Sequence, residues 1–267
     1  MRKRLRIFAG PNGSGKSSII KSIIEKDIGN GVKIDFGIYI NADDIARSIQ
    51  TNSIDFTEYD TEIVISEFLS YSSDSGLIHT EFNLDRLKKC ISIKGNVLSI
   101  LHEVAQMKDD NAYERIAQII AYVLREKLLN EGKKISFETV FSHKGKIDFI
   151  RKAKESGYKV YLYFVSTDSP QINVYRVKTV RVGKNGHDVP TQKIIDRYYR
   201  SMDHLFDAAQ YCYQTYFFDN SLENVSQNLF AHFKLNAEGD KKWTITNEAF
   251  VPNWFIKYYS EKAKKES

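Results

Sequence analysis

The residues best suited to chemistry form the glycine-rich loop GPNGSGKSS, which follows the apolar run 5–9 and leads into a helix-forming run. This is the spacing G-x-x-x-x-G-K-[ST] in its required setting, between a strand and a helix, which disfavours a glycine turn that binds nothing. Loop N–H groups and the helix start converge on phosphate oxygens, while Lys16 reaches the β- and γ-phosphates and Ser17 ligates Mg²⁺. We therefore expect a nucleoside triphosphate and Mg²⁺ to be bound by Gly10, Pro11, Asn12, Gly13, Ser14, Gly15, Lys16, Ser17 and Ser18.

A second set of polar residues follows the next predicted strand, in the run INADDIA. Phosphoryl transfer often needs a carboxylate that takes the proton of the acceptor hydroxyl. We predict that Asp43 is this base. The alternative is that Asp43 or Asp44 caps the helix 45–49, since Asp is a favoured N-cap. Two adjacent aspartates let one cap the helix while the other acts in catalysis, so Asp44 is predicted as a cap or as a contact to the acceptor.

Glu138 and Thr139 close a third predicted strand. In an open α/β sheet, ligands collect at the carboxyl ends of the strands. Glu138 is predicted to orient Mg²⁺ through water or to bind a substrate hydroxyl, with Thr139 beside it. The alternative for Glu138 is a strand-end residue held by backbone N–H groups. No strongly apolar run ending in Asp-Glu follows, which weighs against an ATPase that couples hydrolysis to motion.

Several basic residues surround a glycine-containing loop at 183–190. An arginine carried by a mobile loop can neutralise the charge of the transition state over the triphosphate. Arg181, just before this loop, is the best candidate for a catalytic lid residue, and Arg176 is the second as an ATP contact. Arg197 and Arg200 are three apart on a predicted helix and so share a face. Each could equally be a surface residue.

The elements that must position these residues alternate between strands and helices, which predicts an α/β fold with a parallel sheet covered on both faces. We expect a P-loop NTPase three-layer sandwich over the whole chain, 1–267. The segment 51–110 is polar and serine-rich and is predicted to be a mainly helical insertion, with helix-like spacing at 84–87 and 97–107. A small C-terminal extension, about 222–267, is expected to contain a strand at 241–246 and a helix near 254–262.

Composition limits the class of protein. The chain has 267 residues, 42% of them apolar, and a formal net charge of +5. Its two cysteines, Cys90 and Cys212, are too few and too far apart for a disulfide framework or a zinc site, which suits a reducing cytosol. The apolar run before the loop is too short for a signal peptide, and no run approaches the roughly 18 residues of a membrane span. These features predict a cytoplasmic protein without a membrane partner.

In this order, the landmarks resemble the zeta toxin family of P-loop kinases. The matching segments are GPNGSGKSS, INADDIA, FETVFS, GYKVYLYFVS, GHDVP, RYYRS and FFDNS, within residues 5–47 and 113–221. The resemblance implies ATP-dependent phosphorylation of a small acceptor hydroxyl, which in the well-known toxins belongs to UDP-N-acetylglucosamine. It implies that Asp43 is the base and that Glu138 lines the acceptor site. The chain departs from the family at Val140, where a threonine is common, and in the insertion.

The sequence therefore predicts three alternative functions. The first is a small-molecule kinase, to which an antitoxin-like protein partner would be added by the resemblance. The second is a nucleic-acid end kinase, suggested by the same loop-and-aspartate logic and the basic balance, although nucleic acid is the less expected partner. The third is an ATP-gated module in which the insertion binds a protein.

Overall fold

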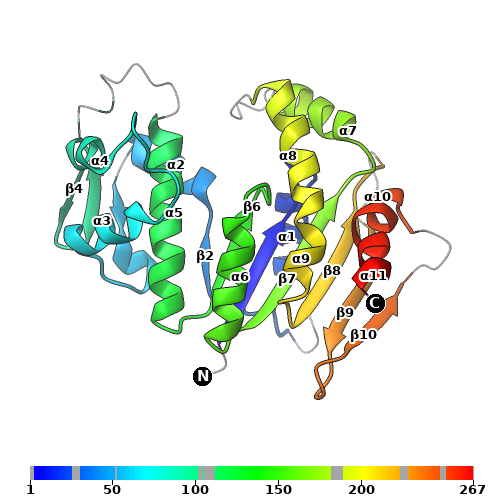
Figure 1. The fold of residues 1–267 in the computed structure, drawn as a ribbon. Coiled ribbons are helices and arrows are strands. Elements are labelled where there is room, and N and C mark those ends of the chain that lie inside the picture. Colours follow the sequence, from blue (N-terminus) through cyan, green and yellow to red (C-terminus); the bar gives the residue numbers. More distant parts are fainter. Residues whose placement is uncertain are drawn as a thin grey trace. The chain divides into compact units, whose positions relative to one another are not determined.

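The computed structural model describes residues 3–25, 31–51, 53–101, 104, 112–181, 189–222, 228–246 and 251–266. The chain divides into two compact units, one formed by Met1–Phe36 with Ser136–Ser267 and the other by Gly37–Ile135 (Figure 1). We describe each unit by itself. None of the described helices is both long and apolar enough to cross a membrane.

The first unit is an α/β sheet structure in which the strands run in the order β10-β9-β8-β7-β1-β6. Strand β7 is parallel to both β1 and β8, whereas β9 is antiparallel to β8 and to β10. The helices α6, α8 and α9 lie across one face of this sheet and α1 lies on the other (Figure 1). The strands are β1 (Arg4–Ala9), β6 (Ile135–Thr139), β7 (Lys159–Ser166), β8 (Gln214–Asp219), β9 (Asn228–Leu235) and β10 (Lys241–Ile245).

The helices of this unit follow the strands, as the sequence pattern predicts. They are α1 (Lys16–Glu25), α6 (Gly145–Glu155), α7 (Pro170–Tyr175), the π-helical turn η3 (Arg176–Arg181), α8 (Thr191–Asp203), α9 (Leu205–Ala209), α10 (Asn253–Phe255), the π-helical turn η5 (Ile256–Ser260) and α11 (Glu261–Glu266). Pro170 begins α7, where its fixed φ suits the first helical turn. The predicted α/β class is confirmed by this alternation.

The core of the first unit is strongly aromatic at its C-terminal end. Phe217 of β8 lies 4.9 Å, between ring centroids, from Phe255 and 5.0 Å from Tyr259, and 5.8 Å from Trp243 of β10. Aromatic side chains bury a large apolar area each, so this cluster fastens the C-terminal extension to the sheet. Cys90 of the second unit and Cys212 of the first are both buried, and neither forms a disulfide.

The second unit is built around α5 (Ala112–Asn130), whose buried residues recur at helical spacing. Helix α2 (Ala42–Thr51) packs against α5. The remaining elements are β2 (Ile38–Ile40), β3 (Ile54–Asp55), the 3₁₀ turn η1 (Phe56–Tyr59), α3 (Ile65–Ser73), α4 (Leu84–Cys90), β4 (Ile91–Lys94) and β5 (Val97–Ile100).

The segment predicted as a mainly helical insertion contains a small sheet as well as helices. The helix expected at 84–87 is confirmed by α4, but Val97–Ile100 is a strand and not part of a helix. It pairs antiparallel with both β3 and β4, in the order β3-β5-β4. The compact unit also extends beyond the predicted insertion at both ends, and an insertion bounded at 51–110 stays a prediction.

Candidate functional site

The backbone of the glycine-rich loop takes conformations that only glycine tolerates. Gly10, Gly13 and Gly15 have φ values of 144°, 74° and 96°. A Cβ at Gly10 would lie 2.0 Å from the carbonyl oxygen of Val165, and one at Gly13 would lie 2.8 Å from that of Asn173. Both glycines are therefore required by close backbone approach as well as by φ.

Lys16 begins helix α1 and is only 5% exposed. Its Nζ atom donates a hydrogen bond of 2.9 Å to the carbonyl oxygen of Pro11 and lies 3.9 Å from Oε1 of Glu138. The Lys16 side chain therefore folds back over the loop, in the concave space where the loop N–H groups and the start of α1 favour an anion.

Ser17 is joined to Glu138 across two neighbouring elements. The Ser17 hydroxyl lies 3.2 Å from Oε1 and 3.1 Å from Oε2 of that carboxylate. Strand β6 is next to β1 in the sheet, and this arrangement brings Glu138 to the loop. A hydroxyl and a carboxylate are hard oxygen donors of the kind Mg²⁺ prefers.

The described residues contain no group of three or more His, Cys, Asp or Glu that could hold a metal alone. Mg²⁺ usually keeps several waters and binds through one or two carboxylates together with substrate phosphates. The Ser17–Glu138 pair therefore fits a Mg²⁺ ion that arrives with a nucleotide.

Two asparagines support the loop from outside it. Asn173 of α7 donates from Nδ2 to the carbonyl oxygen of Asn12 over 2.5 Å, and Asn220, just after β8, donates to that of Ser14 over 2.8 Å. Thr167 Oγ1 in turn is hydrogen-bonded to Asn173 Oδ1. The sequence did not predict that Asn173 or Asn220 supports the loop. The only indication for Asn173 in the sequence was that it is a polar residue in the helix that follows a strand end.

Two polar atoms of the loop are buried without a hydrogen-bond partner among the described residues, Asn12 Oδ1 and Ser14 Oγ. Asn12 is 5% exposed and Ser14 is fully buried. Buried polar groups are nearly always paired, because leaving one unpaired costs about 1–3 kcal/mol. A ligand with phosphate oxygens would give the Ser14 hydroxyl a partner.

Arg176, predicted to contact ATP, makes a different contact here. Its guanidinium donates to the carbonyl oxygens of Asn220, over 2.6 Å, and Leu222, over 3.2 Å. It thereby ties η3 to the segment after β8. The side chain of Arg181 and the loop with Lys184 and His187 lie outside the described residues, so the lid residues stay predictions.

The Asp219 carboxylate, at the end of β8, and the backbone of Asp168, after β7, hold these loops together. Asp219 accepts hydrogen bonds from the Ser221 backbone N–H, over 3.0 Å, and from the Ser221 hydroxyl. Ser221 Oγ accepts in turn from the backbone N–H of Asp168 over 2.9 Å. Burial, and then the nearby charge of Asp219, raise the pKa of Asp168. These bonds give both aspartates a structural role.

Helix α8 carries the basic face that the sequence predicted. Burial and then the charge of Arg200 lower the pKa of Arg197. Burial and the charge of Arg197 lower the pKa of Lys193 in the same way. These cations share a face at helical spacing and repel one another.

Asp43 and Asp44 belong to the second unit, in the first turn of α2, and both are exposed. Asn41, and not Asp44, caps this helix: Asn41 Oδ1 accepts a hydrogen bond of 2.9 Å from the Asp43 backbone N–H. Asp44 is paired with Arg47 one turn along. The expectation that Asp44 caps the helix is therefore wrong, because the helix begins three residues earlier than predicted. The roles of Asp43 and Asp44 toward an acceptor stay predictions.

Thr139 ends β6, and its hydroxyl is 3.5 Å from the carbonyl oxygen of Val140.

No known family model and no curated protein matches the sequence. Among solved structures, the chain is similar to the AvrRxo1-ORF1:AvrRxo1-ORF2 complex with sulphate ions, with a TM-score of 0.51 and 13% identity over 92% of this chain and 62% of that chain. The chain is also similar to the same complex with ATP, with a TM-score of 0.50 and 13% identity over 99% of this chain and 63% of that chain.

A third structure, from the PezAT toxin–antitoxin system of Streptococcus pneumoniae, has a TM-score of 0.45 at 14% identity, covering 99% of this chain and 82% of that chain. At these identities the likeness shows the fold alone. It supports the predicted P-loop fold. The chain spans a little over three fifths of the AvrRxo1 chains that it matches.

Proposed function

We propose that this chain is an ATP-dependent kinase, which transfers the γ-phosphoryl group to a hydroxyl of a small acceptor. The observation that carries the proposal is the cradle formed by the glycine-rich loop, with Lys16 folded over it and the Ser17–Glu138 oxygen pair at its side. The neighbour of similar fold is described with ATP, which agrees with ATP as the donor.

In this proposal the residues of the first unit hold the donor. The loop N–H groups and Lys16 bind and orient the phosphates, and the Ser14 hydroxyl gains an acceptor that it lacks in the described structure. Ser17 and Glu138 would hold Mg²⁺, directly and through water respectively. When bound, Mg²⁺ neutralises the negative charge that develops on the phosphate oxygens.

The acceptor side rests on the sequence and on the resemblance. Asp43 takes the proton of the acceptor hydroxyl while the oxygen forms its bond to the γ-phosphorus and the bond to the β-phosphate oxygen breaks, which releases ADP. Glu138, Thr139 and Asp44 are the proposed contacts to the acceptor. A nucleotide sugar such as UDP-N-acetylglucosamine is the acceptor to test first.

The test is incubation of the protein with γ-labelled ATP and a metabolite pool, in parallel with Asp43→Asn. A general base contributes about 10²–10⁴-fold to a rate. We expect label in one compound with the intact protein and at least a hundredfold less in the variant, with ATP binding retained. Equal labelling by the variant would remove Asp43 from the mechanism, and no acceptor labelling by either protein would contradict the kinase proposal.

We further propose that an antitoxin-like protein binds this chain. The neighbour of similar fold is a complex of two named proteins, AvrRxo1-ORF1 and AvrRxo1-ORF2. Expression of the chain with the product of an adjacent reading frame, followed by size-exclusion chromatography, should give a single complex. Elution of two separate species would contradict this partner.

A further inference from the structure

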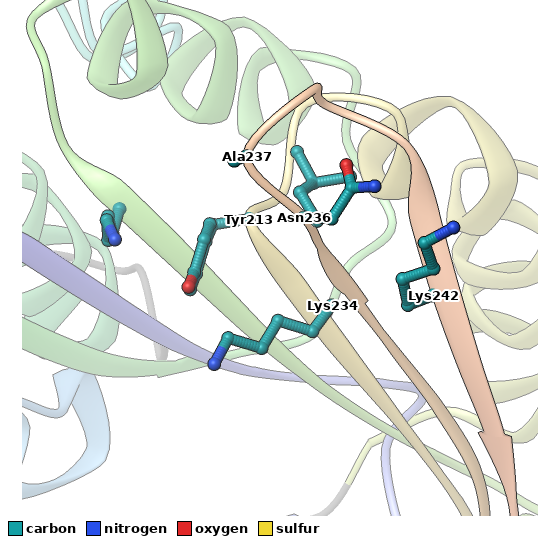
Figure 2. Close-up of a pocket in the computed structure, with 7 residues that line it drawn as sticks. Tyr213, Lys234, Asn236, Ala237 and Lys242 are labelled. Carbon is teal, nitrogen blue, oxygen red and sulfur yellow. The ribbon is translucent and has the colours of Figure 1, made fainter.

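A hollow at the amino ends of β7 and β8 is lined by three lysines and one tyrosine, with Lys159 and Lys234 beside the ring and Lys242 directed away from it (Figure 2). We call it the lysine hollow and define it by Lys159, Lys234, Lys242, Tyr213 and Asn236 (Figure 2). The glycine-rich loop follows the carboxyl end of β1, whereas Lys159 pairs with Arg4 at the other end of that strand. At about 3.3 Å per residue, the six residues of β1 separate the two sites by roughly 20 Å.

The tyrosine ring is fixed between two inner strands. The Tyr213 backbone N–H donates to the carbonyl oxygen of Val160 over 2.9 Å, and its own carbonyl oxygen accepts from the Leu235 N–H over 2.9 Å. Lys159 Nζ lies 4.2 Å from the centroid of the Tyr213 ring, and Lys234 Nζ lies 5.8 Å from it. Two ammonium groups from different strands therefore share one aromatic ring.

The charge in the hollow is not balanced by acidic residues. Lys234 and Lys242 are directly opposite each other across the antiparallel β9–β10 pair, an arrangement of like charges that destabilises a sheet. In the described part of the chain, no ion pair joins a carboxylate to any of the three lysines. The carboxylate of the adjoining turn, that of Asp240, accepts a hydrogen bond from Asn236 instead.

Protection of a sheet edge does not account for this arrangement. Lysines on an edge strand discourage pairing with other chains, which would explain Lys242 on β10. Lys234 and Lys159 belong to β9 and β7, which have neighbours on both sides. Lysines that gather on inner strands against their mutual repulsion are best explained by an anionic ligand.

Aromatic and basic groups continue across the sheet beyond the hollow. The ring centroid of Tyr213 lies 5.6 Å from that of Tyr161, in an edge-to-face arrangement. The Arg6 guanidinium carbon lies 5.0 Å from the centroid of Tyr161, its register partner, but Arg6 is only 6% exposed, so it supports the ring from within and does not contact a ligand. Rings interleaved with cations are the pattern that binds single strands, because phosphates contact the cations and bases stack on the rings.

We propose that the lysine hollow binds single-stranded nucleic acid, with the ammonium groups of Lys159, Lys234 and Lys242 on successive phosphates and a base against Tyr213. An acidic peptide would satisfy the charge but would leave the ring without a stacking partner, so the observations favour the nucleic acid. The site is separate from the proposed kinase site and does not depend on it.

The test measures binding of a fluorescently labelled 15-nucleotide oligothymidylate to the full chain by anisotropy, at several salt concentrations and with saturating ATP and Mg²⁺. Each phosphate contact on a single strand contributes about 0.7 to the slope of log K against log salt. For Lys234→Gln/Lys242→Gln we expect at least tenfold weaker binding and a slope shallower by about 1.4. Lys264→Gln/Lys265→Gln, with the same loss of charge on α11, should bind like the intact protein.

Three further measurements keep the proposal open to contradiction. Lys159→Gln alone should weaken binding with a slope change of about 0.7, which guards against a double variant that fails to fold. Lys16→Ala should bind the oligonucleotide unchanged, and loss of binding there would place the strand at the glycine-rich loop and overturn the proposal. No saturable binding, or equally strong competition by a polyglutamate peptide of the same charge, would also overturn it.

Discussion

Lysines have different surroundings at the two ends of the strands in the first unit's sheet. We call the end next to the glycine-rich loop the carboxyl edge and the end at the lysine hollow the amino edge. At the carboxyl edge, Lys16 is buried and held by the Pro11 carbonyl oxygen with the Glu138 carboxylate nearby. At the amino edge, Lys159 and Lys234 share a tyrosine ring, and Lys234 faces another lysine. The carboxyl edge is therefore preorganised around one small anionic ligand, whereas the amino edge presents a charged surface without internal compensation.

This difference indicates which function, catalysis or binding, each edge suits. A cation fixed by short contacts loses little freedom when a ligand binds, as positioning for phosphoryl transfer requires. Lysines on flexible stems adapt to several positions of a phosphate chain but provide little orientation. We therefore assign chemistry to the carboxyl edge and binding alone to the amino edge.

Gly10→Ala should be the most damaging change at the carboxyl edge. The new Cβ would lie 2.0 Å from a backbone oxygen, at a φ of 144° that alanine rarely adopts. We expect a loss of about 3 kcal/mol or more in the free energy of unfolding, measured in urea. Gly239→Ala, in the β9–β10 turn at a φ of 91° with nothing within 4 Å, should lose only about 1–2 kcal/mol. Equal losses would contradict the close approach at Gly10.

Glu138→Gln should weaken the Mg²⁺ binding that we propose for this edge. The change keeps the shape of the side chain beside Ser17 but removes its charge. Loss of a group that orients a metal through water costs about 10–100-fold in affinity. We expect the Mg²⁺ concentration for half-maximal ADP formation to rise at least tenfold. Glu155→Gln, at the exposed end of α6, is the matched control, and an unchanged Mg²⁺ curve for Glu138→Gln would exclude this role.

His232 should make the stability of the chain depend on pH. Burial lowers its pKa from 6.5, and its Nδ1 atom has no partner among the described residues. The unfolded chain therefore takes up the proton first as the pH falls, so stability is lost as the pH falls from about 6.5 toward the lowered folded pKa. Urea midpoints at pH 7 and pH 5 should differ less for His232→Gln than for the intact protein. The exposed His143→Gln should keep the full difference, and an unchanged difference in His232→Gln would contradict this assignment.

Lys234→Gln should slightly stabilise the chain, because it removes the like-charge pair with Lys242. The expected gain is about 0.2–1 kcal/mol in the free energy of unfolding. Lys242→Gln should give a similar gain, and the double variant should add little beyond either, because both relieve the same repulsion. Fully additive gains would show that the two ammonium groups do not interact.

Local patterns predicted much of the fold, and tertiary contacts account for what they missed. The glycine-rich loop and α5 follow from spacing alone, since each is specified by neighbours in sequence. Strand β5 was predicted as part of a helix because Val97, Leu101 and Val104 also fit helical spacing, and only pairing with β4 decides between the two. Strand β9 was not predicted, because its partners β8 and β10 hold it in place and its own pattern is weak.

The candidate site shows the same division between residues predicted from local patterns and residues placed by tertiary contacts. Lys16, Ser17 and Glu138 were predicted from the motif and from strand ends, and the structure brings them together. The support that Asn173 gives to Asn12 joins residues 161 positions apart, which spacing in the sequence does not reveal. The cap of α2 was assigned to the wrong residue because the helix starts earlier than its apolar pattern.

The most direct test of the account compares label transfer by three proteins: the intact chain, Lys16→Ala and Lys234→Gln/Lys242→Gln. Each is incubated with γ-labelled ATP, Mg²⁺ and the metabolite pool, and the rate of acceptor labelling is measured. Removing one preorganised cation from a transition state costs about 10²–10³-fold. We predict a loss of this size for Lys16→Ala and an unchanged rate for the amino-edge variant. Equal rates for the intact protein and Lys16→Ala would contradict phosphoryl transfer at the glycine-rich loop.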